Sequence, residues 1–189
     1  MSLVGATPRT RITPDDFPGR PWMIALLTEL TRRYPPTPYI YKTALQAGEI
    51  PPDPETGIGG FRYPKDTLLT CSIIGVHMDP ELYPDPEAFR PERFFEGIPD
   101  DLPMAERGRR VWAKAREMEM NYQMLPFGVG PGRCIGRHLF MGIAYSVLDG
   151  LLSRFDVELV NPRPLEPEGG LSVGPPPGGV VVRFRPRAR

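Results

Sequence analysis

Proline is the residue that most restricts what this chain can fold into. The 189 residues include 26 prolines, which is about three times the usual share of about 5%. Proline lacks a backbone N–H and fixes φ, so it interrupts helices and is excluded from central strands. We therefore expect much of the chain to consist of loops and turns with defined paths.

Apolar periodicity predicts three helices between the prolines. Residues 21–34 begin with a proline, which suits the first helical position, and repeat apolar side chains every four residues. Residues 135–155 carry a wide apolar face, which predicts a mostly buried helix. Residues 104–121 are charged and only weakly periodic, which predicts a solvated surface helix.

The remaining segments predict small sheets and connections. Residues 37–78 predict a small twisted sheet, with two strand-like runs on either side of a Pro-Lys-Asp turn. The proline-punctuated residues 79–126 predict a surface meander, and residues 171–186 predict a closing hairpin. Residues 1–17 show no periodicity and are interpreted as a flexible leader. The expected fold class is α+β, mainly helical with small β-sheets.

Charge and cysteine content exclude several classes of protein. The 23 basic and 23 acidic side chains cancel, so no overall field would attract nucleic acid or an anionic membrane. No apolar run approaches the roughly 20 residues that span a bilayer, and the first residues lack the apolar middle of a secretory signal. Two cysteines are too few for a disulfide scaffold. These features predict a cytoplasmic chain without a membrane segment.

The stretch FGVGPGRCIG at residues 127–136 is the strongest candidate for a functional site. Cys134 lies where a loop with four glycines meets the helix predicted at 135–155, so unpaired amides and the helix dipole would stabilise its thiolate. The glycines permit positive φ and allow a flat, bulky group to approach the backbone. In the alternative interpretation, Cys134 is a small buried apolar residue and the glycines form a turn before the helix.

Several motifs in this chain resemble those of the cytochrome P450 superfamily, in the order that the family requires. Phe127, Gly130, Cys134 and Gly136 fit FxxGxxxCxG, which resembles the family's haem-ligand loop. Glu29 and Arg32 resemble its ExxR helix pair. Over residues 18–187 the other similar segments are PPTPYIYK, GFRYPKDTLL, DPELYPDPEAFRPERF and PPPGGVVVRFRPR.

The resemblance implies that the cofactor is haem b, iron protoporphyrin IX, with Cys134 as its axial thiolate ligand. Amides of the glycine loop would then hydrogen-bond the sulfur, and Phe127 would pack beside it or serve as an ordinary core aromatic. The cofactor-binding residues implied are Phe127, Gly128, Gly130, Arg133, Cys134, Gly136 and Lys42.

The resemblance also implies roles for charged residues. Glu29, Arg32 and Arg93 would form an ion-pair network that clamps the meander to the first helix. Lys42 occupies the position of an arginine that reaches a haem propionate in the family, and keeps its charge without the guanidinium fork. Gly132 replaces the family's basic residue two positions before the cysteine, and Arg133 follows it.

The chain resembles the carboxyl-terminal, haem-proximal half of the family's fold. The distal half, with the long central helix that carries an acid/alcohol pair, has no counterpart in this sequence. The expected function is a haem-thiolate monooxygenase that acts on a small apolar substrate with electrons from a reductase or ferredoxin, with a separate amino-terminal half as a further partner. The alternatives are a haem-thiolate hydroperoxide isomerase or peroxygenase, and a truncated, non-catalytic haem-binding remnant.

Three other residues carry weaker alternatives. His138 follows Cys134 by four residues, but two ligands alone make a poor zinc site. A disulfide between Cys71 and Cys134 would consume the expected iron ligand. His77 belongs to no constellation in the sequence and is interpreted as a packing or surface residue.

Overall fold

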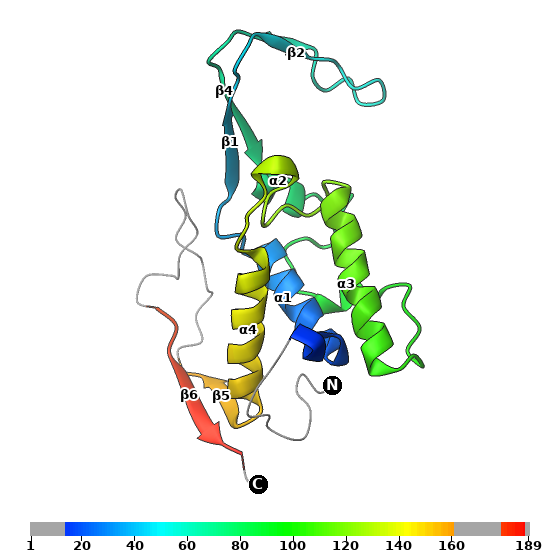
Figure 1. The fold of residues 1–189 in the computed structure, drawn as a ribbon, viewed down its shortest axis with the longest axis vertical. Helices are drawn as coiled ribbons and strands as arrows, with labels where there is room; N and C mark the ends of the chain where they lie inside the picture. The colour runs from blue at the N-terminus through cyan, green and yellow to red at the C-terminus, as the bar shows by residue number, and fades with distance from the viewer. Residues whose placement is uncertain (1–13, 161–178, 188–189) are drawn as a thin grey trace.

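The computed structural model describes residues 14–160 and 179–187. Helix α1 (Pro21–Arg33) lies at the centre of a helical body, between α3 (Met104–Met120) and α4 (Arg137–Leu152) (Figure 1). Short two-stranded sheets lie at both ends of this body. The fold is mainly helical with small antiparallel sheets, which confirms the predicted fold class.

Helix α1 forms where the proline and the apolar periodicity predict it. Pro21 occupies the first turn, where its missing N–H costs no hydrogen bond. The helix ends at Tyr34, whose backbone N–H donates to the carbonyl of Leu30 at 2.9 Å, because the following proline disfavours a helical conformation at Tyr34.

The core consists of two apolar clusters on opposite sides of α1. On one side, Ile24 and Ala25 pack with residues of α3 and of the 3₁₀ turn η2 (Pro91–Phe95). On the other side, Met23 and Leu27 pack with Met141 and Tyr145 of α4. Helix α1 therefore fixes the position of α4, and with it the position of the loop that precedes α4.

The strands of the 37–78 region pair differently from the expectation. Strand β1 (Tyr39–Thr43) pairs antiparallel with β4 (Leu68–Ser72), and β2 (Gly48–Ile50) pairs with β3 (Phe61–Tyr63). The two runs beside the Pro-Lys-Asp turn thus belong to different sheets. Together the four strands form an arm that extends away from the helices (Figure 1).

A short helix replaces the end of the second predicted strand run. Helix α2 covers Ile73–His77 and directly follows β4. The side chain of Ser72 accepts a hydrogen bond from the backbone N–H of Gly75 at 2.9 Å, which caps the helix and ends the strand.

Helix α3 is more buried than a solvated surface helix. Val111, Ala115 and Glu119 recur every four residues and lie buried on the side facing α1 and α4. Gly108 on the same helix leaves no room for a Cβ, because the backbone of Pro18 packs directly against it. The weak apolar spacing conceals this face because one of its members is a carboxylate.

Residues before α1 pack against the helical body. The 3₁₀ helix η1 (Pro14–Gly19) overlaps the end of the expected leader, and the ring of Phe17 stacks on Tyr145 at a centroid distance of 4.2 Å. The leader interpretation is therefore wrong from Pro14 onward. Its other residues, 1–13, lie outside the described part.

Helix α4 is less buried than its wide apolar face predicts. The line through Arg137, Met141, Tyr145 and Asp149 is buried. The neighbouring stripe of Ile135, Leu139, Ile143 and Val147 is exposed, with Leu139 at 68% and Ile143 at 55%. We call these four residues the α4 stripe. They are exposed because α1 covers only one side of the helix.

The strand near the carboxyl end pairs with the chain after α4. Strand β6 (Val182–Pro186) is antiparallel to β5 (Phe155–Leu159), with Val157 opposite Phe184. The expected hairpin within 171–186 is therefore replaced, over its described residues, by a pairing with a distant strand. Residues 171–178 of that expectation lie outside the described part.

Candidate functional site

The loop before α4 turns back on itself so that Cys134 lies beside its beginning. The backbone N–H of Cys134 donates to the carbonyl of Phe127 at 2.8 Å. Gly128 and Gly130 both adopt φ of 65°, a left-handed conformation that costs glycine little. The loop can close in this way because glycine occupies these two turning points.

Cys134 is exposed and free, and it lines a groove between its own loop and the β1–β4 sheet. The cavity has a volume of about 630 Å³, within the usual range of about 300 to 1,000 Å³ for small-molecule and cofactor sites. Phe127, Gly128 and Gly136 line it from the loop, while Gly130 and Arg133 do not. The cysteine is therefore not a small buried core residue.

Lys42 reaches this groove from β1 and lies over Gly132. A Cβ on Gly132 would lie 2.8 Å from the Lys42 Nζ, closer than real side chains approach. The ammonium group thus occupies space that any larger residue at 132 would contest. Glycine at position 132, where the family usually has a basic residue, therefore leaves room for the Lys42 ammonium at the same place.

Arg133 faces away from the groove and contacts α3. Its Nη2 donates to Oε2 of Glu119 at 3.1 Å, and Arg137 donates to Oε1 of the same carboxylate through Nη2 at 2.7 Å. The geometry does not support the prediction that Arg133 binds the cofactor. Instead, Arg133 ties the Cys134 loop to α3 through Glu119, and Arg137 ties the beginning of α4 to the same carboxylate.

Sequence reasoning missed Glu119, which is buried among three arginines. Besides Arg133 and Arg137, Arg116 donates to it at 3.2 Å. The guanidinium of Arg137 also lies 4.7 Å from the ring centroid of Trp112, and burial lowers the pKa of Arg137. The available signal was that Glu119 continues the four-residue repeat of Val111 and Ala115. A carboxylate at a buried position needs charged partners, so the repeat indicated a buried ion pair.

Glu29, Arg32 and Arg93 meet in the core between α1 and the meander. Arg32 contacts Glu29 at two points, Nε to Oε2 at 2.8 Å and Nη2 to Oε1 at 2.9 Å. Arg93 Nε donates to Oε1 at 3.2 Å. The Glu29 carboxylate is fully buried and also accepts the backbone N–H of Arg90 at 2.8 Å. The three charged groups therefore join α1 to η2 at some distance from the groove.

Both guanidinium groups continue from Glu29 to carbonyls of the meander. Arg32 Nη2 donates to the carbonyl of Pro86 at 2.9 Å, and Arg93 Nη1 donates to that of Pro84 at 3.3 Å. Tyr83 lies beneath both, 5.0 Å from the Arg32 guanidinium, and burial raises its pKa. The two arginines thus provide hydrogen-bond donors for carbonyl groups of the meander that lie outside helices and strands.

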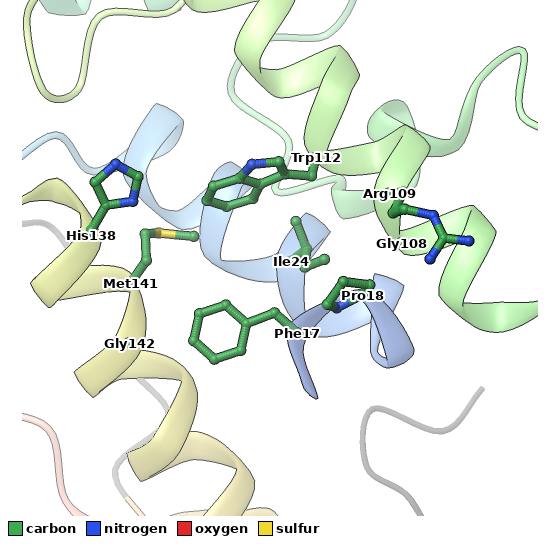
Figure 2. A pocket seen from close by; sticks show the side chains of 9 residues that line it. All are labelled: Phe17, Pro18, Ile24, Gly108, Arg109, Trp112, His138, Met141 and Gly142. Carbon is green, nitrogen blue, oxygen red and sulfur yellow. The ribbon is translucent and has the colours of Figure 1, made fainter. Parts of the chain in front are cut away.

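His138 lines a different cavity from Cys134. This cavity, of about 400 Å³, lies between η1, α3 and α4, with Phe17, Trp112 and Met141 among its lining residues (Figure 2). Within the described residues, no group of three His, Cys, Asp or Glu side chains could hold a metal ion. The zinc alternative for Cys134 and His138 therefore has no structural support.

Cys71 lines the same groove as Cys134 from strand β4, and both thiols are free. The disulfide alternative is thus not formed in this structure. Cys71 also provides a second thiol in the same surroundings against which Cys134 can be compared.

None of the helices in residues 14–160 and 179–187 combines the length and the apolar character needed to cross a membrane.

Comparison with known proteins relates the chain to one family. The model of the family described as Cytochrome P450 matches residues 4–182. Dimethylnonatriene synthase of Arabidopsis thaliana is 30% identical over 177 residues, which cover 92% of this chain and 30% of that protein. A probable cytochrome P450 28c1 of Drosophila melanogaster is 31% identical over 170 residues, which cover 88% and 30%.

Among solved structures, the retinoic acid bound cyanobacterial CYP120A1 has a similar fold. It superposes with a TM-score of 0.67 at 24% identity, over 96% of this chain and 36% of that one. The chain spans about 30% of the length of the first curated relatives that it matches. The matched family model and these relatives show that the chain belongs to the cytochrome P450 family.

Proposed function

We propose that this chain forms the haem-binding part of a cytochrome P450 monooxygenase, with haem b held in the groove of Cys134. One observation carries the proposal: an exposed cysteine, a lysine ammonium and glycine backbone line a single cavity. Haem combines an iron, a flat apolar macrocycle and carboxylates, and each part meets a matching feature of this cavity. The residues present therefore fit the group.

Cys134 would hold the haem iron through its sulfur, as a thiolate. A cysteine thiolate supplies electron density that favours cleavage of the O–O bond at the haem. The chain's own part is to present the sulfur just before α4 and, with haem in the groove, to help keep water away from it. Phe127 and Phe140, with ring centroids 5.6 Å apart, line the groove and provide an apolar wall for this purpose.

Lys42 is assigned to a haem carboxylate. Its ammonium lies at the Cys134 loop, and glycine at position 132 leaves room for it. Because Arg133 pairs with Glu119, Lys42 is the basic residue available for such a contact among the described residues that line the groove. An ammonium holds a carboxylate as a point charge, without the two-point geometry of a guanidinium.

The reaction proposed is monooxygenation of a small apolar substrate. One atom of O₂ is inserted into a bond of the substrate and the other leaves as water, with consumption of two electrons and two protons. The electrons come from NAD(P)H through a reductase or ferredoxin partner. Family membership and the groove lined by Cys134 support this reaction. We assign the binding of the substrate to the rest of the cytochrome P450 fold.

We further infer that the α4 stripe is covered by the remaining part of a cytochrome P450 fold, in the same polypeptide or in another. The stripe presents four apolar side chains in a row next to Cys134. Monomeric soluble proteins rarely leave such a contiguous apolar surface uncovered. The relatives are about three times as long as the matched region, so their additional length can supply the cover.

Haem reconstitution tests the proposal. The chain is mixed with haem, reduced and exposed to carbon monoxide, in parallel with Cys134→Ser and Cys71→Ser. We expect the red-shifted Soret band of thiolate ligation in the parent chain and in Cys71→Ser, and its loss in Cys134→Ser with the circular dichroism spectrum retained. A band that survives in Cys134→Ser, or fails to form in the parent chain, would overturn the assignment.

A further inference from the structure

His77 is a buried histidine whose two ring nitrogens bind two different segments of the chain. It ends α2 and is fully buried. Its Nδ1 lies 2.9 Å from the carbonyl oxygen of Arg32, and its Nε2 accepts the backbone N–H of Leu125 at 2.8 Å. Since Nε2 accepts a hydrogen bond, the ring proton resides on Nδ1 and is donated to Arg32.

His77 and Arg32 bind each other's backbone. While the histidine ring donates to the Arg32 carbonyl, Nη1 of Arg32 donates to the His77 carbonyl at 2.7 Å. Arg32 is in turn held by Glu29 at two points. His77 is therefore fixed to the buried ion pairs of α1, and its Nε2 is a rigid acceptor aimed at Leu125.

Leu125 is the first residue of the Cys134 loop, which covers residues 125–136. Its carbonyl accepts the N–H of Gly128 at 3.0 Å, and Phe127 between them accepts the N–H of Cys134 at 2.8 Å. The backbone position of Leu125 thus decides where the first turn of the loop begins, and this turn carries the carbonyl to which Cys134 is bound.

A second contact holds the segment just before Leu125. Tyr83, whose ring lies edge-on to His77 at a centroid distance of 6.4 Å, donates its hydroxyl to the carbonyl of Gln123 at 2.7 Å. The approach to the loop is thereby held at two neighbouring residues by two buried side chains. Neither contact was visible from the sequence, in which His77 precedes Leu125 by 48 residues.

We propose that His77 is a positioning residue that sets the beginning of the Cys134 loop through its hydrogen bond from Leu125, and so places the sulfur in the groove. The Leu125 N–H is buried, and a buried donor that loses its acceptor keeps the full penalty of its removal from water. Burial lowers the pKa of His77 from 6.5 to about 4, so Nε2 keeps its lone pair at neutral pH. The inference rests on the proposed function only where sulfur placement is detected through haem.

Two substitutions test the two hydrogen bonds of the His77 ring separately. In His77→Gln the amide oxygen can reach the position of Nε2 and accept from Leu125. In His77→Asn the shorter amide can reach only the position of Nδ1 and donate to Arg32. Each variant loses the ring and one of its two hydrogen bonds, so a role in packing alone predicts the same result for both.

The first measurement is hydrogen–deuterium exchange without haem. We expect His77→Asn to exchange at least about fivefold faster than His77→Gln at the backbone amides of residues 125–134, the effect of one lost hydrogen bond. The amides of α4 from Met141 onward should exchange equally in both. Equal exchange at residues 125–134 in the two variants would overturn the inference, whether or not the chain binds haem.

The second measurement is the reduced carbon monoxide spectrum after haem reconstitution. His77→Gln should retain the thiolate Soret band of the parent chain, and His77→Asn should lose most of it or need about tenfold more haem. If the parent chain takes up no haem, the proposed function fails and the exchange result still decides the inference. If His77→Asn does not fold, His77→Gln is compared with the parent chain, and faster exchange or a lost thiolate band in His77→Gln overturns the inference.

Discussion

Replacement of Glu29 by glutamine should be among the most destabilising single changes in this chain. The carboxylate is fully buried and accepts four hydrogen bonds, two from Arg32, one from Arg93 and one from the backbone of Arg90. A glutamine has almost the same shape, but its amide carries no charge and turns a donor toward one of these donors. Two buried guanidinium groups would then lack their counter-charge.

The cost can be estimated from this arrangement. Removing one partner of a buried ion pair costs about 3–5 kcal/mol, out of a typical total stability of about 5–15 kcal/mol. For a chain of this size, about 1 kcal/mol corresponds to roughly 2–4 °C in melting temperature. We therefore expect Glu29→Gln to lower the melting temperature by roughly 6 to 20 °C.

Thermal unfolding followed by circular dichroism measures this effect, and Glu49 provides the matched control. Glu49 pairs with Arg62 at 2.9 Å on the exposed arm, where the two side chains are 49% and 85% exposed. Such a pair contributes about 0.2–1 kcal/mol, so Glu49→Gln should leave the melting temperature nearly unchanged. If Glu29→Gln melts within a few degrees of Glu49→Gln, the buried network does not hold the fold in the way described.

Three other predictions follow from the groove and the core. Lys42→Gln should weaken haem binding by roughly two- to fivefold, as expected for an exposed charge pair. Gly132→Ala, which displaces the Lys42 ammonium, should weaken haem binding by the same factor. Haem titration of the double variant should show no further loss of affinity. Because burial lowers the pKa of His77 from 6.5 to about 4, only the unfolded chain takes up this proton as pH falls through 6.5. The contribution of His77 to stability should therefore fall by about 3 kcal/mol between these two pH values, and denaturant titrations should show a smaller loss of stability over this range in His77→Gln than in the parent chain. Leu27→Ala should cost about 2–5 kcal/mol because Leu27 is buried in the core, whereas Leu139→Ala should cost less than about 0.5 kcal/mol; equal costs would contradict the exposure of the α4 stripe.

The elements that the sequence predicts well are those with local signals. Pro21 and a four-residue apolar repeat define α1 within one residue of its predicted end. The sequence marks four glycines around Cys134 as able to adopt positive φ; Gly128 and Gly130 do so, whereas Gly136 has φ of −80°. Such signals suffice where neighbouring residues alone determine the conformation.

Long-range partners could not be predicted from the same signals. The strand-like runs on either side of the Pro-Lys-Asp turn predict one small sheet, yet β3 and β4 pair with different strands in separate two-stranded sheets. The burial of Glu119 and His77 depends on arginines and backbone groups distant along the chain. Their residue types were visible in the sequence, but nothing local indicates which groups they meet.

The apolar face of α4 shows a different limit of sequence reasoning. Its periodicity predicts burial, and half of that face is indeed packed on α1. The other half is exposed in the described structure. Periodicity shows which side chains prefer to leave water, but their actual burial depends on what else is present to pack against them.

Exposure of the α4 stripe has a practical consequence for handling this protein. Ile135, at the beginning of the stripe, directly follows Cys134 and is fully exposed. Detergent, a second copy of the chain or any other apolar material that adsorbs along the stripe will therefore reach the edge of the groove that Cys134 lines. The degree of association of the chain in a preparation and the amount of haem that it binds should therefore vary together. Sedimentation and absorbance need to be recorded on the same sample.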